Sequence, residues 1–186
     1  MKTYLKYSGL AVQSHRGGSL ESPENTLESF SYSQSIGCKY IETDVQISLD
    51  GIPYIFHDET LTRILKKDII FSSLHSSEID KLSIFNNHPI PTLEKALNDF
   101  PEMFFQIDVK TDEVAIPALE IIKKCNAVDR VCIASFNSKR LNNVYKNCPE
   151  VCLSMGPIEV FKLLLASFNL YNKDIRGDCL QVPIYQ

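Results

Sequence analysis

Two carboxylates lie two residues apart in an apolar stretch of the sequence, at Glu42 and Asp44. Because successive side chains of a β-strand point to opposite faces, this spacing places both carboxylates on one face. Asp108 and Lys110 repeat the spacing in a second apolar stretch. Three carboxylates on strand faces can hold a hard divalent cation through oxygen ligands, and Lys110 could neutralise part of their charge when no ion is bound. The alternatives are a solvated strand face for the first pair and a plain internal ion pair for Lys110.

Two histidines accompany these carboxylates. His15 starts the string His-Arg-Gly-Gly, and His57 follows the second apolar run after Asp44. The planar fork of Arg16 matches phosphate oxygens, and glycines allow a ligand to approach the backbone closely. Histidine suits proton transfer because its pKa lies near neutrality. These residues together suit a site for an anionic substrate, whereas His75 and His88 are expected on the surface.

The elements that must position these side chains can be read from apolar and amphipathic runs. Apolar runs predict strands at residues 9–14, 40–49, 52–57, 103–110, 131–136, 151–155 and 179–182. Amphipathic runs predict helices at residues 26–35, 93–99, 116–125, 138–147 and 158–168. Asn25 with Glu28 resembles a capping box for the first helix, and Pro157 suits the first turn of the last. This alternation predicts an α/β fold with a mainly parallel sheet.

The sequence Asp50-Gly51 predicts a two-residue type I′ hairpin turn, because both residues tolerate positive φ angles. Residues whose numbers sum to 101 would then face each other, which places His57 opposite Asp44. One face of this hairpin is expected to be core and contains Ile41, Thr43, Val45, Ile47, Leu49, Ile52, Tyr54 and Phe56. The other face would carry the polar side chains of Glu42, Asp44, Gln46 and Ser48.

Composition predicts one soluble globular domain over residues 1–186. Apolar residues make up 44% of the chain and charged residues 23%, with a net charge of −4 that gives no basic surface for nucleic acid. The first ten residues contain no continuous apolar run, so neither a secretory signal nor an integral membrane segment is expected. The six cysteines form no CxxC pair, which predicts reduced thiols in a cytoplasmic protein rather than disulfides or a zinc site.

Several short strings, in their order and spacing, resemble the glycerophosphodiester phosphodiesterase family. They are His15-Arg16-Gly17, Pro23-Glu24-Asn25-Thr26, Glu42-x-Asp44, Asp50-Gly51, His57-Asp58, Pro91-Thr92-Leu93-Glu94, Asp108-x-Lys110 and Ser135-Phe136. The resemblance runs from about residue 9 to the end of the chain.

The resemblance implies a TIM-type (β/α) barrel with its site at the C-terminal ends of the strands. By this similarity, His15 and His57 are the general acid and base, and Arg16 and Lys110 bind the phosphate. One divalent cation, Ca²⁺ or Mg²⁺, would be bound by three carboxylates: Glu42, Asp44 and Asp108. The implied reaction releases an alcohol and glycerol-3-phosphate from a small-molecule glycerophosphodiester, in glycerophospholipid catabolism. The alternatives are a lysophospholipase D-like enzyme of the same superfamily and a truncated, inactive phosphate-binding paralogue.

The sequence departs from the family pattern at two places. Asp108 stands where the family usually has glutamate, so the position or preference of the ion should differ. The chain also contains no tryptophan and stops at Gln186, before the Trp-containing segment and final strand that family members have. We therefore expect a barrel that is incomplete at its C-terminus, with self-association through the open edge and low activity.

Overall fold

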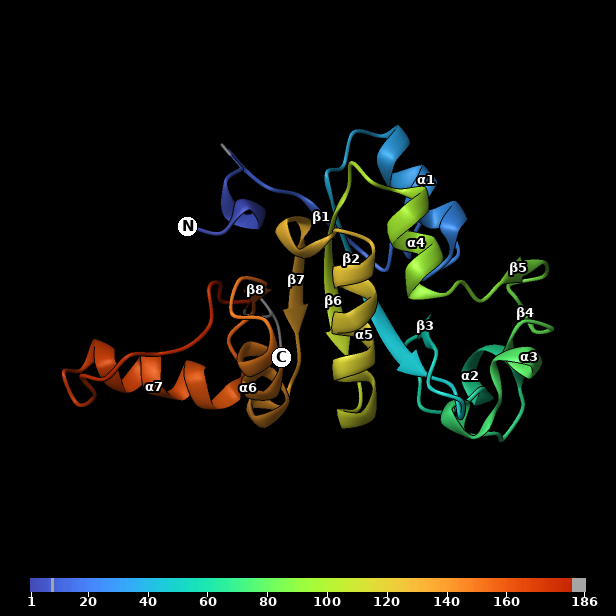
Figure 1. Cartoon of the computed structure of the whole chain (residues 1–186). Helices are drawn as coiled ribbons and strands as arrows, with labels where there is room; N and C mark the ends of the chain where they lie inside the picture. The colour runs from blue at the N-terminus through green and yellow to red at the C-terminus, as the bar shows by residue number, and fades with distance from the viewer. Residues whose placement is uncertain (8, 182–186) are drawn as a thin grey trace.

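The computed structural model describes residues 1–7 and 9–181, and its centre is a six-stranded sheet (Figure 1). The parallel strands follow the order β1-β2-β6-β7-β8, and β3 pairs with β2 in the antiparallel direction. Their bounds are β1 Gln13–His15, β2 Tyr40–Ile47, β3 Pro53–Ile55, β6 Phe104–Val109, β7 Val131–Ala134 and β8 Cys152–Leu153. Cys179 continues the sheet beside β8 through an isolated parallel bridge to Ser154. Within the described residues, this sheet does not close into a barrel.

The helices that join the strands match the predicted ones closely. They are α1 Leu27–Ser35, α4 Leu93–Asp99, α5 Asp112–Lys124, α6 Ser138–Asn147 and α7 Pro157–Ser167. Helix α5 begins one turn earlier than predicted, because the Thr111 side chain caps it by accepting a hydrogen bond from the Val114 amide. The expected capping box of Asn25 and Glu28 is wrong. Thr26 and Ser29 form the box of α1 instead.

The two faces of the sheet differ sharply in polarity. Odd-numbered residues of β2, β6 and β7, such as Ile41, Ile107 and Ile133, are fully buried under α1, α4, α5 and α6. Even-numbered residues carry the polar groups in rows set by the strand register. One row is His15, Glu42, Gln106, Cys132 and Cys152, and the next contains Asp44, Asp108 and Ala134. The predicted site residues therefore share the face of the sheet that those four helices leave uncovered.

The hairpin register predicted from Asp50-Gly51 is wrong by one residue. Val45 faces Ile55 and Gln46 faces Tyr54, so paired numbers sum to 100, with a three-residue loop between Ser48 and Ile52. Gly51 has φ 86°, the left-handed residue that follows a turn in such loops.

This shift moves side chains to the other face, and it places Phe56 opposite Asp44, where His57 was expected. Tyr54 and Phe56 leave the main core and pack with Phe71 in a second cluster. The predicted core residues Leu49 and Ile52 are 58% and 40% exposed. Two of the eight residues assigned to the core face therefore lie at the surface.

Residues between β3 and α4 form a small unit that the sequence analysis did not predict. It contains α2 Thr62–Leu65, α3 Ser76–Ile79 and a short hairpin of β4 Ser83–Ile84 with β5 His88–Pro89. Its buried side chains, including Leu61, Phe71, Ile79 and Ile84, make the second hydrophobic cluster. Short 3-10 turns complete the fold at Thr3–Leu5 (η1), Phe71–Ser73 (η2) and Val128–Arg130 (η3).

The last described segments differ from the predicted ones in their surroundings. Helix α7 projects away from the sheet in Figure 1 and contains no buried residue. The strand predicted at residues 179–182 is reduced to the bridge at Cys179, and residue 182 lies outside the described residues. No helix in the described part of the chain combines the length and the hydropathy needed to cross a bilayer.

Candidate functional site

Asp44 and Asp108 are register partners on the adjacent strands β2 and β6, so their carboxylates lie side by side. Lys110, just beyond β6, places its Nζ 2.7 Å from Asp44 Oδ1 and 2.6 Å from Asp108 Oδ2. The Asp44 side chain is only 2% exposed, which makes a compensating cation necessary. The structure thus brings together three of the predicted residues, because the strand register pairs the two aspartates and Lys110 lies just beyond β6.

Glu42 lies one row away on the same face of β2. Its Oε2 accepts a hydrogen bond of 3.1 Å from the Arg16 backbone amide and lies 3.8 Å from Nε2 of His15. Burial and, after it, the neighbouring Asp44 charge raise the pKa of Glu42 to about 7. The carboxylate cluster therefore carries more negative charge than Lys110 and Arg16 offset.

Arg16 is held at the end of β1 by two carboxylates rather than being free. Its Nη1 lies 3.0 Å from Glu24 Oε1, and its Nε lies 3.3 Å from Asp44 Oδ2. Arg16 adopts a left-handed φ of 51°, and Gly17 follows with φ 78°. A Cβ atom at Gly17 would lie 2.3 Å from Ser29 Oγ, so glycine is required for α1 to pack against this turn.

Asn25 fixes the orientation of the Asp44 carboxylate. Its amide Nδ2 donates to Asp44 Oδ2 at 2.9 Å, and its Oδ1 accepts from the Thr43 hydroxyl at 2.8 Å. Asn25 is almost fully buried and has a left-handed φ of 57°. The Pro-Glu-Asn-Thr string thus supplies a side chain that positions a predicted metal ligand, a role that the sequence analysis did not assign.

His57 is held by a chain of charged side chains. Its Nδ1 lies 2.7 Å from Asp58 Oδ1, and Arg63 Nε donates to Asp58 Oδ2 at 2.7 Å. The same Arg63 guanidinium donates to Glu24, the partner of Arg16. This series of charged side chains connects the loops that carry the two histidines, through the contact between Arg63 and Glu24, which are 39 positions apart in the sequence. Sequence spacing gives no signal for that contact, and Arg63 was not predicted.

His15 is the more exposed of the two histidines, with 66% of its side chain accessible. Partial burial and then the Arg16 charge lower the pKa of His15, although Asp44 and Glu24 act in the opposite direction. A protonated His57 ring also lowers the pKa of His15. His75 is exposed as predicted, whereas His88 is half-buried and lies 3.1 Å from Glu28.

An open cleft of about 530 Å³ lies beside these groups. His57, Lys110 and Gln46 line it together with Arg140 of α6. Arg140 is held in place because its Nη1 donates to the Val109 carbonyl and to Ser135 Oγ. His15, Arg16 and the three predicted carboxylates do not line this cleft, and the sequence analysis did not identify Arg140. The volume lies within the usual range for a small-molecule site.

The donor set fits a hard divalent cation, because Glu42, Asp44 and Asp108 offer only oxygen ligands and lack sufficient counter-charge. Lys110 Nζ occupies the place between the two aspartates. Among the described residues, the three carboxylates do not bring ligand oxygens within 4.8 Å of one another. A cation held by all three would therefore require the Lys110 ammonium to move aside.

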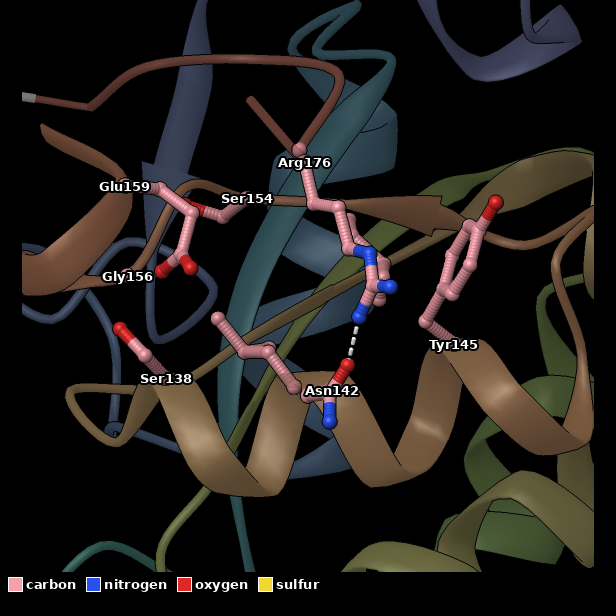
Figure 2. Close-up of a pocket in the computed structure, with 10 residues that line it drawn as sticks. Ser138, Asn142, Tyr145, Ser154, Gly156, Glu159 and Arg176 are labelled. Carbon is pink, nitrogen blue, oxygen red and sulfur yellow. Dashed lines mark hydrogen bonds between the residues drawn. The ribbon is translucent and has the colours of Figure 1, made fainter. Parts of the chain in front are cut away.

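A second, smaller hollow of about 20 Å³ lies between α6, the start of α7 and residues 176–177 (Figure 2). Arg176 donates a hydrogen bond to Asn142, which Figure 2 marks. Its Cζ atom lies over the Tyr145 ring, 4.9 Å from the ring centroid. Glu159 points into it with an Oε2 atom that has no hydrogen-bond partner among the described residues. None of the predicted site residues lies here.

The strand–helix order and the polar groups at the ends of the strands define a (β/α)-barrel type of fold, represented here by an open sheet. The chain belongs to the glycerophosphoryl diester phosphodiesterase family, whose profile matches residues 15–152. This match confirms the resemblance drawn from the short motifs.

Named relatives and solved structures agree with this assignment. "Probable glycerophosphodiester phosphodiesterase 2" of Mycobacterium tuberculosis is 33% identical over 138 residues, which cover 74% of this chain and 52% of that protein. A glycerophosphodiester phosphodiesterase of Thermotoga maritima superposes with a TM-score of 0.72 at 28% identity, over 87% of this chain and 71% of the other. A phosphodiesterase of Oleispira antarctica, solved in complex with the product sn-glycerol-3-phosphate, gives a TM-score of 0.75 at 27% identity, over 86% and 72%. The chain spans about half the length of the mycobacterial relative.

Proposed function

We propose that this protein hydrolyses glycerophosphodiesters to an alcohol and glycerol-3-phosphate. The observation that carries the proposal is the pairing of Asp44 and Asp108 with Lys110 between them, beside a cleft that His57 lines. The product-bound Oleispira antarctica structure supports the same chemistry, because that protein shares the fold and is 27% identical to this chain over the superposed residues. No observation favours a lysophospholipase D-like activity or an inactive paralogue.

In the proposed reaction, His57 acts as the general base. A hydrogen bond from the protonated Nδ1 to Asp58 would leave Nε2 without a proton. In this tautomer Nε2 can accept a proton from water or from the glycerol hydroxyl. His15 protonates the leaving alcohol, since its exposed ring at the end of β1 can reach a substrate above the carboxylates. Lys110 contacts the phosphate from the wall of the cleft, and Arg16 holds the turn that carries His15.

Glu42, Asp44 and Asp108 would hold one Ca²⁺ or Mg²⁺ ion. Such an ion supplies positive charge that stabilises the phosphate oxygens as negative charge develops on them. Asn25 keeps one Asp44 oxygen fixed by its hydrogen bond and leaves the other free to exchange Lys110 for a different cation. The shorter Asp108, in place of glutamate, sets the size of the site.

Three broader expectations accompany this proposal. We infer that residues 1–186 form one domain and that the protein acts in glycerophospholipid catabolism. We infer a cytoplasmic location because all six cysteines are unpaired thiols. We also infer self-association. β1 pairs only with β2 among the described strands, and Ile158, Phe161 and Leu164 of α7 expose apolar side chains. Sedimentation that shows a monomer at all concentrations would exclude this last point.

The decisive assay measures glycerol-3-phosphate released from glycerophosphodiesters, with and without a chelator. We expect release that requires a divalent ion and disappears in His57→Ala. The control Lys139→Met changes an exposed residue of α6 and should be neutral. Absence of release with every diester and ion tested, from a folded sample, would reject the proposed function.

A further inference from the structure

Three cysteines outside the carboxylate site converge on the polar face of the sheet. Cys132 of β7 and Cys152 of β8 are register partners, and Cys179 lies beside β8 along the bridge to Ser154. The Sγ atoms of Cys132 and Cys179 are 3.7 Å apart, and all three Sγ atoms lie within 4.8 Å of one another. Cys132 and Cys152 are buried, whereas Cys179 is half-buried, so the cluster has one side toward solvent.

We propose that Cys132, Cys152 and Cys179 form a binding site for a thiophilic metal ion of the Zn²⁺ class. Zinc–thiolate bonds of about 2.3 Å in a tetrahedron place the sulfur atoms about 3.8 Å apart. The observed Cys132–Cys179 separation of 3.7 Å already matches that edge. Small shifts of the Cys152 rotamer would complete a three-sulfur face, with a water molecule on the solvent side as fourth ligand.

The backbone holds the third cysteine firmly in place. The Asp178 amide donates to the Leu153 carbonyl at 2.7 Å, and the Leu153 amide donates to Asp178 Oδ2 at 2.9 Å. The Met155 amide donates to the Cys179 carbonyl at 2.8 Å. These bonds align Cys179 with β8 although 26 residues separate it from Leu153. A bound ion would therefore join two strands and a distant segment that the sheet has already positioned.

Tyr4 of η1 covers the buried side of the cluster. Its ring packs at right angles to Tyr40 and Phe104, and Gln13 donates to its hydroxyl. Burial, and then the three neighbouring thiols, raise the pKa of Tyr4, so the phenol keeps its proton. A protonated phenol can donate a hydrogen bond to sulfur, and it leaves the three thiolates as the charged ligands. The alternative is that the thiols simply pack as small apolar side chains.

The cysteine site is distinct from the carboxylate site. Gln106 of β6 stands between Glu42 and Cys132 in the same row, so two strand spacings of about 4.8 Å each separate them. Their ligand chemistry differs as well, because thiolates select soft or borderline ions and carboxylates select Mg²⁺ or Ca²⁺. Occupation of one site should therefore leave the other available.

The test uses the whole chain, reduced and freed of metal, with Cd²⁺ and Zn²⁺ as probes. We expect the ultraviolet charge-transfer band of cadmium–thiolate bonds to saturate at one ion per chain. Cys179→Ser should lower the affinity at least about 100-fold, since even the loss of an outer-shell partner costs 10- to 100-fold. The matched control Cys38→Ser/Cys125→Ser removes two half-buried thiols outside the cluster and should bind like the wild type.

A second measurement keeps the proposal falsifiable if a variant fails to fold. In the wild type, Zn²⁺ should protect Cys179, the half-buried member of the cluster, from alkylation and leave Cys38 and Cys125 as reactive as before. Equal labelling with and without Zn²⁺, absence of the cadmium band, or an undiminished band in folded Cys179→Ser would each overturn the proposal. These readouts do not depend on hydrolysis, so they stand or fall separately from the proposed phosphodiesterase activity.

Discussion

Lys110→Met tests the carboxylate site most directly. The substitution keeps an unbranched apolar side chain of nearly the same length and removes the ammonium that lies 2.7 Å from Asp44 and 2.6 Å from Asp108. Asp44 would keep its contacts with Arg16 and Asn25, whereas Asp108 would lose the cation that it contacts. Without that cation, two nearly buried negative charges face each other.

Removing one partner of a buried ion pair costs about 3 to 5 kcal/mol. The Lys110 side chain is 20% exposed at the wall of an open cleft, and Arg16 still offsets part of the Asp44 charge. The cost should therefore lie at the low end of this range. We expect the variant to lose about 3 kcal/mol of stability in chelator. For a chain of this size, that loss corresponds to a fall in Tm of about 6 to 12 °C.

Divalent ions should reverse this loss, because the ammonium no longer competes for the two aspartates. At a free concentration about 100 times the Kd, an ion adds about 2.7 kcal/mol by mass action. Urea unfolding in chelator and in saturating Ca²⁺ or Mg²⁺ measures both effects. Lys110→Arg keeps a cation at the site, and Lys139→Met is the exposed control. The reasoning would be refuted if Lys110→Met were as stable as the wild type in chelator. It would also be refuted if the ion raised the stability of the variant no more than that of the wild type.

Three further predictions concern the same edge of the sheet. His57→Ala and His15→Ala should each lower turnover about 10²- to 10⁴-fold with unchanged circular dichroism, and near-normal turnover would remove that histidine from proton transfer. Asp44→Asn should abolish most of the rise in Tm that a divalent ion causes in thermal scans; an unchanged rise would mean that Asp44 is no ligand. Arg63→Met should change stability by no more than about 1 kcal/mol, because its side chain is 47% exposed. It should nevertheless lower kcat and shift the pH profile, since Asp58 loses the guanidinium that fixes it. An unaltered pH profile would show that the charge chain does not position His57.

Features that depend on local periodicity could be predicted from the amino-acid sequence alone. The spacing of Glu42 with Asp44, and of Asp108 with Lys110, placed each pair on one face because side chains alternate along a strand. Helices α4 and α6 have the bounds predicted for residues 93–99 and 138–147, because polar caps and an apolar face define them locally.

Which of these local elements contact one another depends on long-range packing, and it became clear only from the folded chain. The register of β2 against β6 places Asp44 opposite Asp108, and packing between distant loops brings Arg63 to Glu24. The hairpin register was missed because both a two-residue and a three-residue loop can use Asp-Gly, and the choice lies in the left-handed backbone of Gly51.

The cysteine cluster shows the same limit most clearly. Cys132, Cys152 and Cys179 have no spacing typical of a metal site, because each comes from a different segment of the sheet. Parallel strands are joined through intervening helices, so residues that are neighbours across the sheet lie twenty or more positions apart in the chain. The residue types were visible in the sequence, but their convergence follows from strand order and register, which local patterns do not encode.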